Sequence, residues 1–503
     1  MSLDPRTPVL VGVGQVTERP DPDRSLTERD EPASLMERAL AAAADDCGAG
    51  RGLLERTGSL RVVQPISWRY ANAGALVAQR LGIEPAEIAQ GPIGGNTPLV
   101  IAGGAAQDIA AGRVDVVAVV GGECLYTRVA AQRDPDRPLL SWTTQPADTA
   151  EPVALGTDRS PVTDLELERG LTRPTAVYPL FENALRAAAG ETIDEHQVKV
   201  SRLWARFSEV AASNPYAWSR DLRSAEEIRT PTADNRMVAF PYPKLMNAND
   251  RVDQAAGFLM CSLEAARSAG VPEDNMVFLL AGADATDHWY LTHRDRLDAS
   301  PAIARCGARA LEGAGLTIDD VGHVDLYSCF PCAVQIGANE LGLAVDDPAR
   351  PLTVTGGLGF AGGPINNYGS HALATMARRL RADPGSVGLT TGVGWYLTKH
   401  VVALWSTSPP AAGVRWESPQ EEIDALAQRS PAGAFEGECV VETYSVVCGR
   451  DGQPQSATLA LLTDDGSRTW GTVSDSGMLD SLVSEEGCGR KARLRSDGRA
   501  ELP

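Results

Sequence analysis

Two stretches of the chain, residues 93–122 and 362–394, repeat one layout. Each begins with a turn that contains Gly and Pro, continues through small residues in a helical stretch, and ends in an apolar strand that runs into glycines. Continuous apolar runs such as VVAVVGG are typical of strands covered on both faces, as in parallel sheets. The repeat therefore predicts a duplicated α/β fold in which two βαβ halves meet over buried helices.

The helix of the first copy is expected to be one of these buried helices. Thr97 can cap it, and Pro98 fits its first turn, where the missing N–H of proline has no intrahelical partner to lose. Residues 102–106 are all Ala or Gly. Such small residues allow a sheet or a second helix to approach closely, which only a buried helix requires.

Composition narrows the classes of partner. A length of 503 residues suggests roughly two to four domains. The formal net charge of −20 disfavours nucleic acid and anionic membranes. No apolar run approaches the length of a spanning helix, and the start MSLDPRTPVLVG reads as a strand, not a signal peptide. Nine cysteines, an odd number, favour reduced thiols, so we expect a cytoplasmic protein.

The pattern along the chain divides it into five segments. Alternating strand and helix patterns fill the first, third and fourth segments. The second segment is an insertion of short helices and loops rich in Pro, Ser and Thr. A Pro-rich linker at 408–413 precedes the fifth segment. The predicted boundaries are 1–125 (first half), 126–246 (inserted loop domain), 247–273 (end of the first half), 274–407 (second half) and 414–503 (C-terminal domain).

The fifth segment has the pattern of a small β-barrel. Its β-branched runs are separated by two hairpin signals, Arg450-Asp451-Gly452 and Asp464-Asp465-Gly466. A short helix is predicted near 478–485, followed by one final strand over 491–502. Short alternating strands of this spacing predict an OB-like barrel.

Four sequence blocks within residues 7–406 resemble, in order, those of the thiolase superfamily. NANDRVDQAAGFLMCSLEAARSAGV resembles the thiolase segment after the inserted loop domain, and VDLYSCFPCAVQIGANELGL resembles the NEAF block. GGLGFAGGP resembles the lead into the GHP block, and TTGVGWYLTKHVVALWS resembles the CxG block. The C-terminal domain resembles the extension of actinobacterial thiolase-like proteins of type 1, which are related to sterol-carrier-type thiolases. The resemblance implies a thiolase fold, with two βαβαβαββ halves layered α/β/α/β/α, plus an OB-like barrel.

The resemblance also locates the catalytic positions of thiolases. In those enzymes a Cys thiolate attacks the acyl thioester, and a His stabilises the thiolate and the oxyanion. A water held by an Asn completes the oxyanion hole, and a second Cys transfers the α-proton. In this chain the four positions hold Gly95, Gly363, Tyr327 and Gly392, in that order. Glycine supplies no nucleophile, acid or base, and loss of a nucleophile costs about a million-fold in a protease triad. Ordinary thiolase chemistry is therefore expected to be absent.

Three residues remain as candidates for a different chemistry. The NEAF position reads YSCF where sterol-carrier-type thiolases carry HDCF, and some thiolase-like aldolases of steroid side-chain breakdown carry a Tyr; this singles out Tyr327 and Cys329. His371 lies eight residues after Gly363 and can act as a base. The alternative is that Cys329 and His371 pack in the core and Tyr327 fills the space of a lost water. Cys329 and Cys332 have C-x-x-C spacing, but without a second pair no metal is expected.

A CoA site is easier to retain than catalysis. In thiolases the inserted loop domain covers CoA, basic residues lie near its phosphates, and a Ser contacts the pantetheine. That Ser position is Asn249 here, and Arg202 and Arg206, with Trp204 between them, are candidates for the nucleotide end. The alternative is that the two arginines form a solvated helix face. The expected ligand is CoA or acyl-CoA, and no covalently bound cofactor is expected.

Two functions from different classes remain open. The chain either binds CoA or acyl-CoA without thiolysis, as a carrier, sensor or assembly subunit, or it is a thiolase-fold enzyme of altered chemistry, such as a retro-aldolase, acyltransferase or acyl-CoA hydrolase. Thiolases pair as dimers through a sheet edge of the first half. We expect the C-terminal barrel to cover that edge and to give a monomer, the alternatives being a dimer or a protein partner bound through the barrel.

Overall fold

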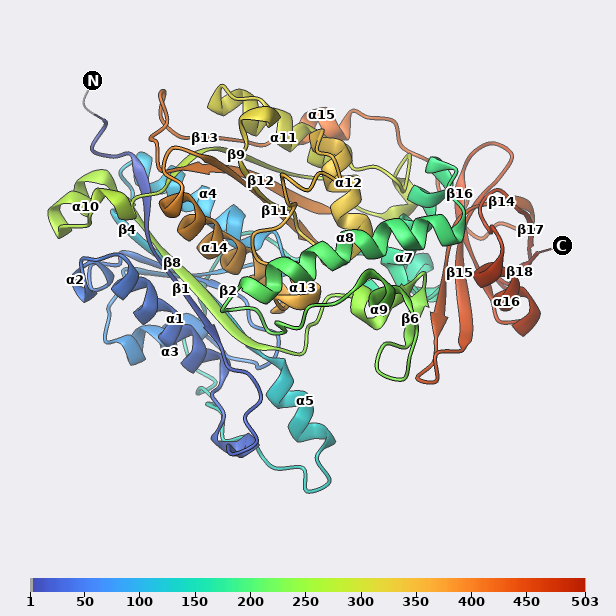
Figure 1. The fold of residues 1–503 in the computed structure, drawn as a ribbon, viewed down its shortest axis with the longest axis horizontal. Coiled ribbons are helices and arrows are strands. Elements are labelled where there is room, and N and C mark those ends of the chain that lie inside the picture. The colour runs from blue at the N-terminus through green and yellow to red at the C-terminus, as the bar shows by residue number, and fades with distance from the viewer. Residues whose placement is uncertain (1–2, 503) are drawn as a thin grey trace.

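Two central sheets organise most of the chain in the computed structural model, which describes residues 3–502 (Figure 1). The first sheet has six strands in the order β1-β8-β4-β2-β3-β5. They are β1 (Pro8–Thr17), β2 (Ser59–Val63), β3 (Glu87–Gly91), β4 (Val116–Cys124), β5 (Val153–Ala154) and β8 (Asp253–Ser262). Strand β2 is parallel to β3 and β4, whereas β8 is antiparallel to β1 and β4. Strand β8, which follows the insertion, thus completes the first sheet.

The second sheet is built from the second half of the chain. Its order is β10-β11-β12-β9-β13. The strands are β9 (Phe278–Thr286), β10 (His323–Asp325), β11 (Val387–Gly394), β12 (Lys399–Ser406) and β13 (Arg415–Glu417). Strand β13 lies beyond the linker yet pairs in parallel with β9. The predicted start of the C-terminal domain at residue 414 is therefore too early, because the chain first adds an edge strand to the second sheet.

Helices form the remaining layers. Between the sheets lie α4 (Thr97–Ala110) and α14 (Tyr368–Ala382), each of which contacts strands of both sheets. The outer face of the first sheet is covered by α1 (Pro32–Asp46) and α3 (Ala73–Leu81), and that of the second by α11 (Pro301–Ala314). Helix α12 (Pro331–Leu341) packs beside α11; short helices α2 (Arg51–Leu54), α10 (Leu263–Ala269) and α13 (Gly357–Phe360) complete the halves. The duplicated fold with layers α/β/α/β/α is confirmed.

Helix α4 is buried as its small residues predict. A Cβ built on Gly103 would lie 2.4 Å from the Trp416 ring of β13, so a larger side chain would prevent this contact. The predicted cap is wrong by one residue: Asn96 is the N-cap and Thr97 is already helical. The Thr97 hydroxyl donates instead to the carbonyl of Pro92, at 2.8 Å, in the preceding turn.

The insertion contains longer helices than predicted. They are α5 (Leu125–Arg133), α6 (Asp164–Glu168), α7 (Pro174–Ala189), α8 (Ile193–Ser213) and α9 (Ala225–Arg229). The prediction of short helices is wrong for α7, which has 16 residues. Helix α8 has 21 residues and contains the stretch QVKVSRLWARFSEVAA, in which Val200, Leu203, Trp204 and Phe207 have the spacing of one helical face. A capping box of Thr192 and Glu195 starts α8, and its apolar stripe is buried, so local signals and packing against the body agree in this helix.

The C-terminal domain forms a third sheet, which lies at one end of the molecule beside α7 (Figure 1). Its order is β16-β15-β14-β17-β18, and an isolated bridge between Thr472 and Arg499 links the two ends. The elements are α15 (Gln420–Asp424), β14 (Gly437–Cys448), β15 (Pro454–Leu462), β16 (Arg468–Val473), α16 (Ser476–Ser484), β17 (Lys491–Leu494) and β18 (Ala500–Glu501). Both predicted hairpins are present. The predicted final strand is two strands, because the chain turns at Gly498, which has a φ of 80°.

The insertion and the C-terminal domain share this sheet. Strand β6 (Met237–Phe240) from the insertion pairs with β14, and it also pairs with β7 (Tyr242–Pro243). By contrast, the C-terminal strands pair with neither end of the first sheet. The expectation that they cover its edge is wrong: β5 from the insertion pairs with Ala89 and Gln90 of β3 and occupies that edge.

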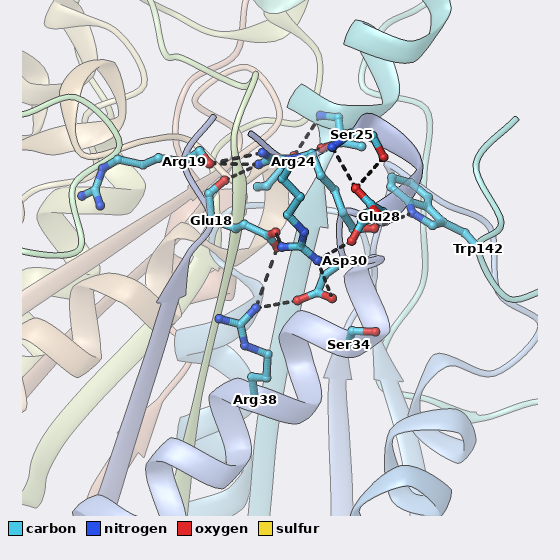
Figure 2. Close-up of polar contacts among 12 residues, drawn as sticks. Glu18, Arg19, Arg24, Ser25, Glu28, Asp30, Ser34, Arg38 and Trp142 are labelled. Carbon is cyan, nitrogen blue, oxygen red and sulfur yellow. Dashed lines mark hydrogen bonds and ion pairs between the residues drawn. The ribbon is translucent and has the colours of Figure 1, made fainter. Parts of the chain in front are cut away.

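The loop between β1 and α1 is fastened to the first half by charged groups. At the surface Arg38 contacts Asp30 at 2.5 Å and Glu18 at 3.8 Å, and Arg24 also pairs with Glu18 (Figure 2). Deeper in, Arg29 pairs with Asp253 of β8 at 3.1 Å, and both side chains are buried. Exposed pairs contribute about 1 kcal/mol or less each. Arg29 also donates to the backbone carbonyls of Glu18 and Arg19, so its guanidinium ties the loop to β8.

A buried histidine joins the insertion to the second half. His196 of α8 contacts Glu182 through Nε2 and Glu191 through Nδ1, each at 2.6 Å. Glu182 also accepts from the hydroxyl of Tyr242 at 2.5 Å and from Gln335 of α12 at 2.6 Å. Burial alone lowers the pKa of His196, but the two carboxylates outweigh it, and the net pKa is raised.

This raised pKa predicts a pH-dependent contribution to stability. The folded state holds the proton more tightly than the unfolded state, so the contribution is complete below the unfolded pKa of about 6.5 and is lost as pH rises through the folded pKa. We expect the difference in free energy of unfolding between the wild type and His196→Gln to shrink steadily above about pH 6.5. Urea denaturation of both proteins from pH 6 to 9 measures it, and a constant difference would contradict a protonated His196.

Candidate functional site

Three of the four thiolase-like catalytic positions meet between the sheets. Gly95 precedes α4, Gly392 lies in β11, and Tyr327 follows β10. A Cβ built on Gly95 would lie 2.1 Å from the Tyr327 hydroxyl oxygen and 2.6 Å from the carbonyl oxygen of Val393. A Cβ on Gly392 would lie 3.3 Å from the carbonyl oxygen of Gly95. Residues from distant parts of the sequence thus form one compact cluster.

The fourth position, Gly363, lies beside the predicted pantetheine contact. Its N–H donates to the carbonyl of Asn249 at 2.9 Å, and the N–H of Asn249 donates to the carbonyl of Leu358 at 3.0 Å. A Cβ on Gly363 would be 3.4 Å from its nearest neighbour, the Asn249 carbonyl oxygen, which is an ordinary contact. The space at Gly363 is therefore open enough for a small side chain, whereas the space at Gly95 is filled.

Tyr327 is what fills the space at Gly95. Its side chain is 6% exposed, and its ring meets that of Tyr368 edge-on at 5.4 Å between centroids. Burial raises its pKa, so the phenol stays protonated near neutral pH. The Tyr327 phenol therefore occupies the space in which the side chain of a nucleophile at position 95 would begin. The alternative from the sequence placed it only in the space of a lost water.

Cys329 is buried and carries a neutral thiol. Burial raises its pKa to about 12, despite an opposing hydrogen bond from Tyr178. Cys332 is fully buried, and its Sγ donates to the carbonyl oxygen of Tyr178 at 3.5 Å. Both thiols are free, and residues 3–502 contain no group of His, Cys, Asp and Glu side chains arranged to hold a metal ion. A thiol with so high a pKa is a poor nucleophile near neutral pH.

His371 points elsewhere. It lies in α14, and its Nδ1 contacts the side-chain oxygen of Gln15 on β1 at 3.0 Å. Burial lowers its pKa to about 3, which keeps the imidazole neutral. The structure therefore directs His371 toward the first sheet and Tyr327 toward Gly95, and these two candidates do not share a partner.

The arginines predicted for a nucleotide lie on α8 with different surroundings. Arg202 is exposed, whereas the guanidinium of Arg206 donates to the carbonyl of Val345. Trp204 between them is buried and stacks on Phe207 at 5.1 Å. A Cβ on Gly359 would be 3.4 Å from Nε1 of Trp204, so this face of α8 packs onto the glycine-rich segment before Gly363. Of the three, only Arg202 is freely available to a ligand in solution.

Sequence reasoning missed a buried lysine beside the cluster. Lys399 is 8% exposed, its ammonium donates to the carbonyl of Ile93, and burial lowers its pKa. The nearby side-chain oxygen of Asn96 is buried and has no hydrogen-bond partner within residues 3–502. The hairpin that precedes Lys399 holds Trp395 and Leu397 at φ values of 56° and 50°, which are strained for such residues. The lysine at the first position of the closing strand, ahead of its apolar run, was the signal available in the sequence.

Comparisons with known proteins agree with this architecture. The family model of the thiolase-like protein type 1 additional C-terminal domain matches residues 419–499. A crystal structure of a monomeric SCP2-thiolase-like protein type 1 from Mycobacterium smegmatis is 33% identical, with 100% of both chains covered and a TM-score of 0.84. No curated protein matches the chain.

More distant solved structures share the fold alone. An Ltp2-ChsH2(DUF35) aldolase is 19% identical over 80% of this chain and 98% of its own, with a TM-score of 0.60. The dimeric peroxisomal thiolase of Saccharomyces cerevisiae is 13% identical over 81% of this chain and 99% of its own, with a TM-score of 0.56. Across the described part of the chain, no helix combines the length and apolar character needed to cross a membrane.

Proposed function

The chain belongs to the family of thiolase-like proteins of type 1, and we propose that within it this protein binds CoA or acyl-CoA without performing thiolysis or Claisen condensation. The observation that carries the proposal is the contact between Tyr327 and Gly95. A nucleophilic side chain at position 95 would have to start inside the Tyr327 phenol. Covalent acyl transfer needs an activated nucleophile next to a base, and this cluster places a protonated phenol against a glycine.

The remaining groups support binding more than chemistry. Cys329 is a neutral thiol, and His371 is a neutral imidazole that faces Gln15. The insertion still lies over the glycine-rich segment through Trp204 and Phe207 of α8, and Arg202 remains exposed on the same helix. A positive side chain at the rim of a site attracts an anionic ligand such as the phosphates of CoA.

The second function, an enzyme of altered chemistry, keeps one observation in its favour. The Tyr327 hydroxyl has no hydrogen-bond partner within residues 3–502, so it is free to donate to a ligand oxygen. A retro-aldolase, acyltransferase or hydrolase would in addition need a base beside Tyr327, and His371 does not face it.

The occupied edge of β3, together with the monomeric relative, favours a monomer.

Calorimetric titration with CoA and a series of acyl-CoAs, followed by mass analysis of the recovered ligand, tests the proposal. We expect binding with the ligand chemically unchanged. Arg202→Glu should weaken CoA binding by about tenfold or more if the nucleotide end lies at α8, because one attraction becomes a repulsion. Arg495→Glu, on the C-terminal domain, is the matched control and should bind as the wild type does.

Each result separates the two functions. A hydrolysed, cleaved or transferred acyl group would establish the enzyme and overturn the non-catalytic proposal. The absence of heat with any of the ligands would remove CoA as the ligand altogether.

A further inference from the structure

A small cavity lies where the C-terminal domain meets the second half of the fold. It has a volume of about 230 Å³. One wall comes from the loop between β9 and α11, including His288 and Arg294, and the other from Ile423, Leu426 and Ala427 in and after α15. Helix α15 packs beside α11 in Figure 1, and the two are in contact. The second wall lies within the residues matched by the family-specific C-terminal domain.

The cavity has a positive group that is short of partners. Arg294 is 5% exposed; its Nε donates to the carbonyl of His288 at 3.1 Å, and its Nη2 donates to Thr398 at 2.9 Å. Its Nη1 has no hydrogen-bond partner within residues 3–502. Arg294 therefore has one nitrogen left without an oxygen in the described chain.

The acidic residues of the cavity do not supply that oxygen. Asp287 is buried and already accepts from Ser300 at 2.5 Å and from the N–H of Ala302 at 3.0 Å, and it contacts His400 at 3.1 Å. Asp295 is 60% exposed, and Arg296 pairs with Asp298. Burial lowers the pKa of Arg294, and Asp287 and Glu166, which favour its charged form, offset this only in part. The guanidinium carbon lies 5.7 Å from the centre of the Phe181 ring, and Nη1 remains without an acceptor among the described residues.

We propose that this cavity binds a short-chain aliphatic monocarboxylate, with the carboxylate on Arg294 and the chain against Ile423, Leu426 and Ala427. Guanidinium matches the planar geometry of a carboxylate. A cavity of about 150 Å³ holds benzene, so 230 Å³ suits a chain of about six carbons. Because both walls are needed, the ligand also clamps the C-terminal domain to the body. The site is separate from the Gly95 cluster and does not depend on the proposed CoA binding.

Titration with sodium hexanoate and, separately, with 1-hexanol tests the proposal. We expect hexanoate to bind and hexanol to bind at least tenfold more weakly, because the alcohol lacks the charge. Ala427→Trp should fill the cavity and weaken hexanoate at least tenfold. Ala427 is exposed, so this variant is expected to fold, and Ala425→Trp on the neighbouring exposed position is the matched control that should bind normally.

Three results would overturn the proposal. Equal binding of hexanol and hexanoate would make the site purely apolar. Unchanged binding to Ala427→Trp would place the hexanoate elsewhere. No binding of hexanoate to the wild type would exclude the site. Arg294→Met adds a check on the charge, and its circular dichroism spectrum shows whether the variant remains folded.

Discussion

Gly95→Ala is expected to destabilise the protein by roughly 3 kcal/mol or more, a large cost for one methyl group. The new Cβ would lie 2.1 Å from the Tyr327 hydroxyl oxygen, 2.4 Å from Cζ of Tyr327 and 2.6 Å from the carbonyl oxygen of Val393. The ring is held against Tyr368, and Val393 is part of β11, so neither neighbour can give way cheaply. Urea denaturation measures the change in the free energy of unfolding.

Gly363→Ala is the matched control. Its Cβ would meet ordinary contacts at 3.4 Å and beyond, and its φ lies outside the left-handed region. Losing backbone freedom in the unfolded chain is then the main effect, so the variant should be neutral or up to about 1 kcal/mol more stable. Equal losses at the two positions would show that the Tyr327 contact is not the cause.

A double-mutant cycle with Tyr327→Ala tests the contact directly. Removing the phenol relieves two of the three close approaches, so the double variant should be less destabilised than the sum of the single variants by about 1–3 kcal/mol. For the same reason Gly95→Cys alone should not restore thiolysis of a 3-oxoacyl-CoA. Restored thiolysis by Gly95→Cys would overturn the assignment of Tyr327 as the group that fills the position.

Arg468→Met is the second variant with a large expected effect, about 3–5 kcal/mol. Arg468 of β16 is fully buried and binds Glu442 through two hydrogen bonds of 2.6 Å each. Its remaining nitrogen donates to the carbonyl of Leu291 at 2.7 Å and to that of Arg294. Removing the guanidinium leaves the largely buried Glu442 carboxylate with only Arg429, at 3.8 Å, and takes one donor from the carbonyls of Leu291 and Arg294. These groups lie at the junction between the C-terminal domain and the second half.

The measurement is urea denaturation combined with limited proteolysis of the C-terminal domain. We expect a lower midpoint and faster cleavage after the linker. Arg495→Met is the control: its pair with Glu501 has side-chain exposures of 43% and 47%, and loss of such a pair costs about 1 kcal/mol or less. Arg468→Met with Glu442→Leu should recover part of the loss, since it also removes the Glu442 charge that has lost its nearer partner. A loss no larger than that of Arg495→Met would mean that Arg468 does not fasten the domain.

The local sequence determined the elements and their duplication. Apolar strands with glycine-rich ends, the small residues of α4 and the two hairpin signals each have a short-range physical cause, and each appears in the structure. The resemblance in four ordered blocks added the thiolase architecture. Local signals misjudged the length of α7, whereas the apolar stripe of α8 is visible in the sequence and is stabilised in the structure by distant partners such as the segment around Gly359.

The tertiary structure alone decided which groups meet. No sequence pattern near Gly95 predicts that the phenol of Tyr327, 232 positions later, occupies the space of a Cβ at position 95. Likewise, the pairing of β13 with β9, of β6 with β14 and of β5 with β3 depends on strand edges left open by other segments. Burial then fixes the chemistry, since it keeps Cys329 and His371 neutral and leaves Lys399 beside the cluster. The sequence determines which residues are present. Contacts between distant side chains, the burial of ionisable groups and the free edges of the sheets arise only when the chain has folded.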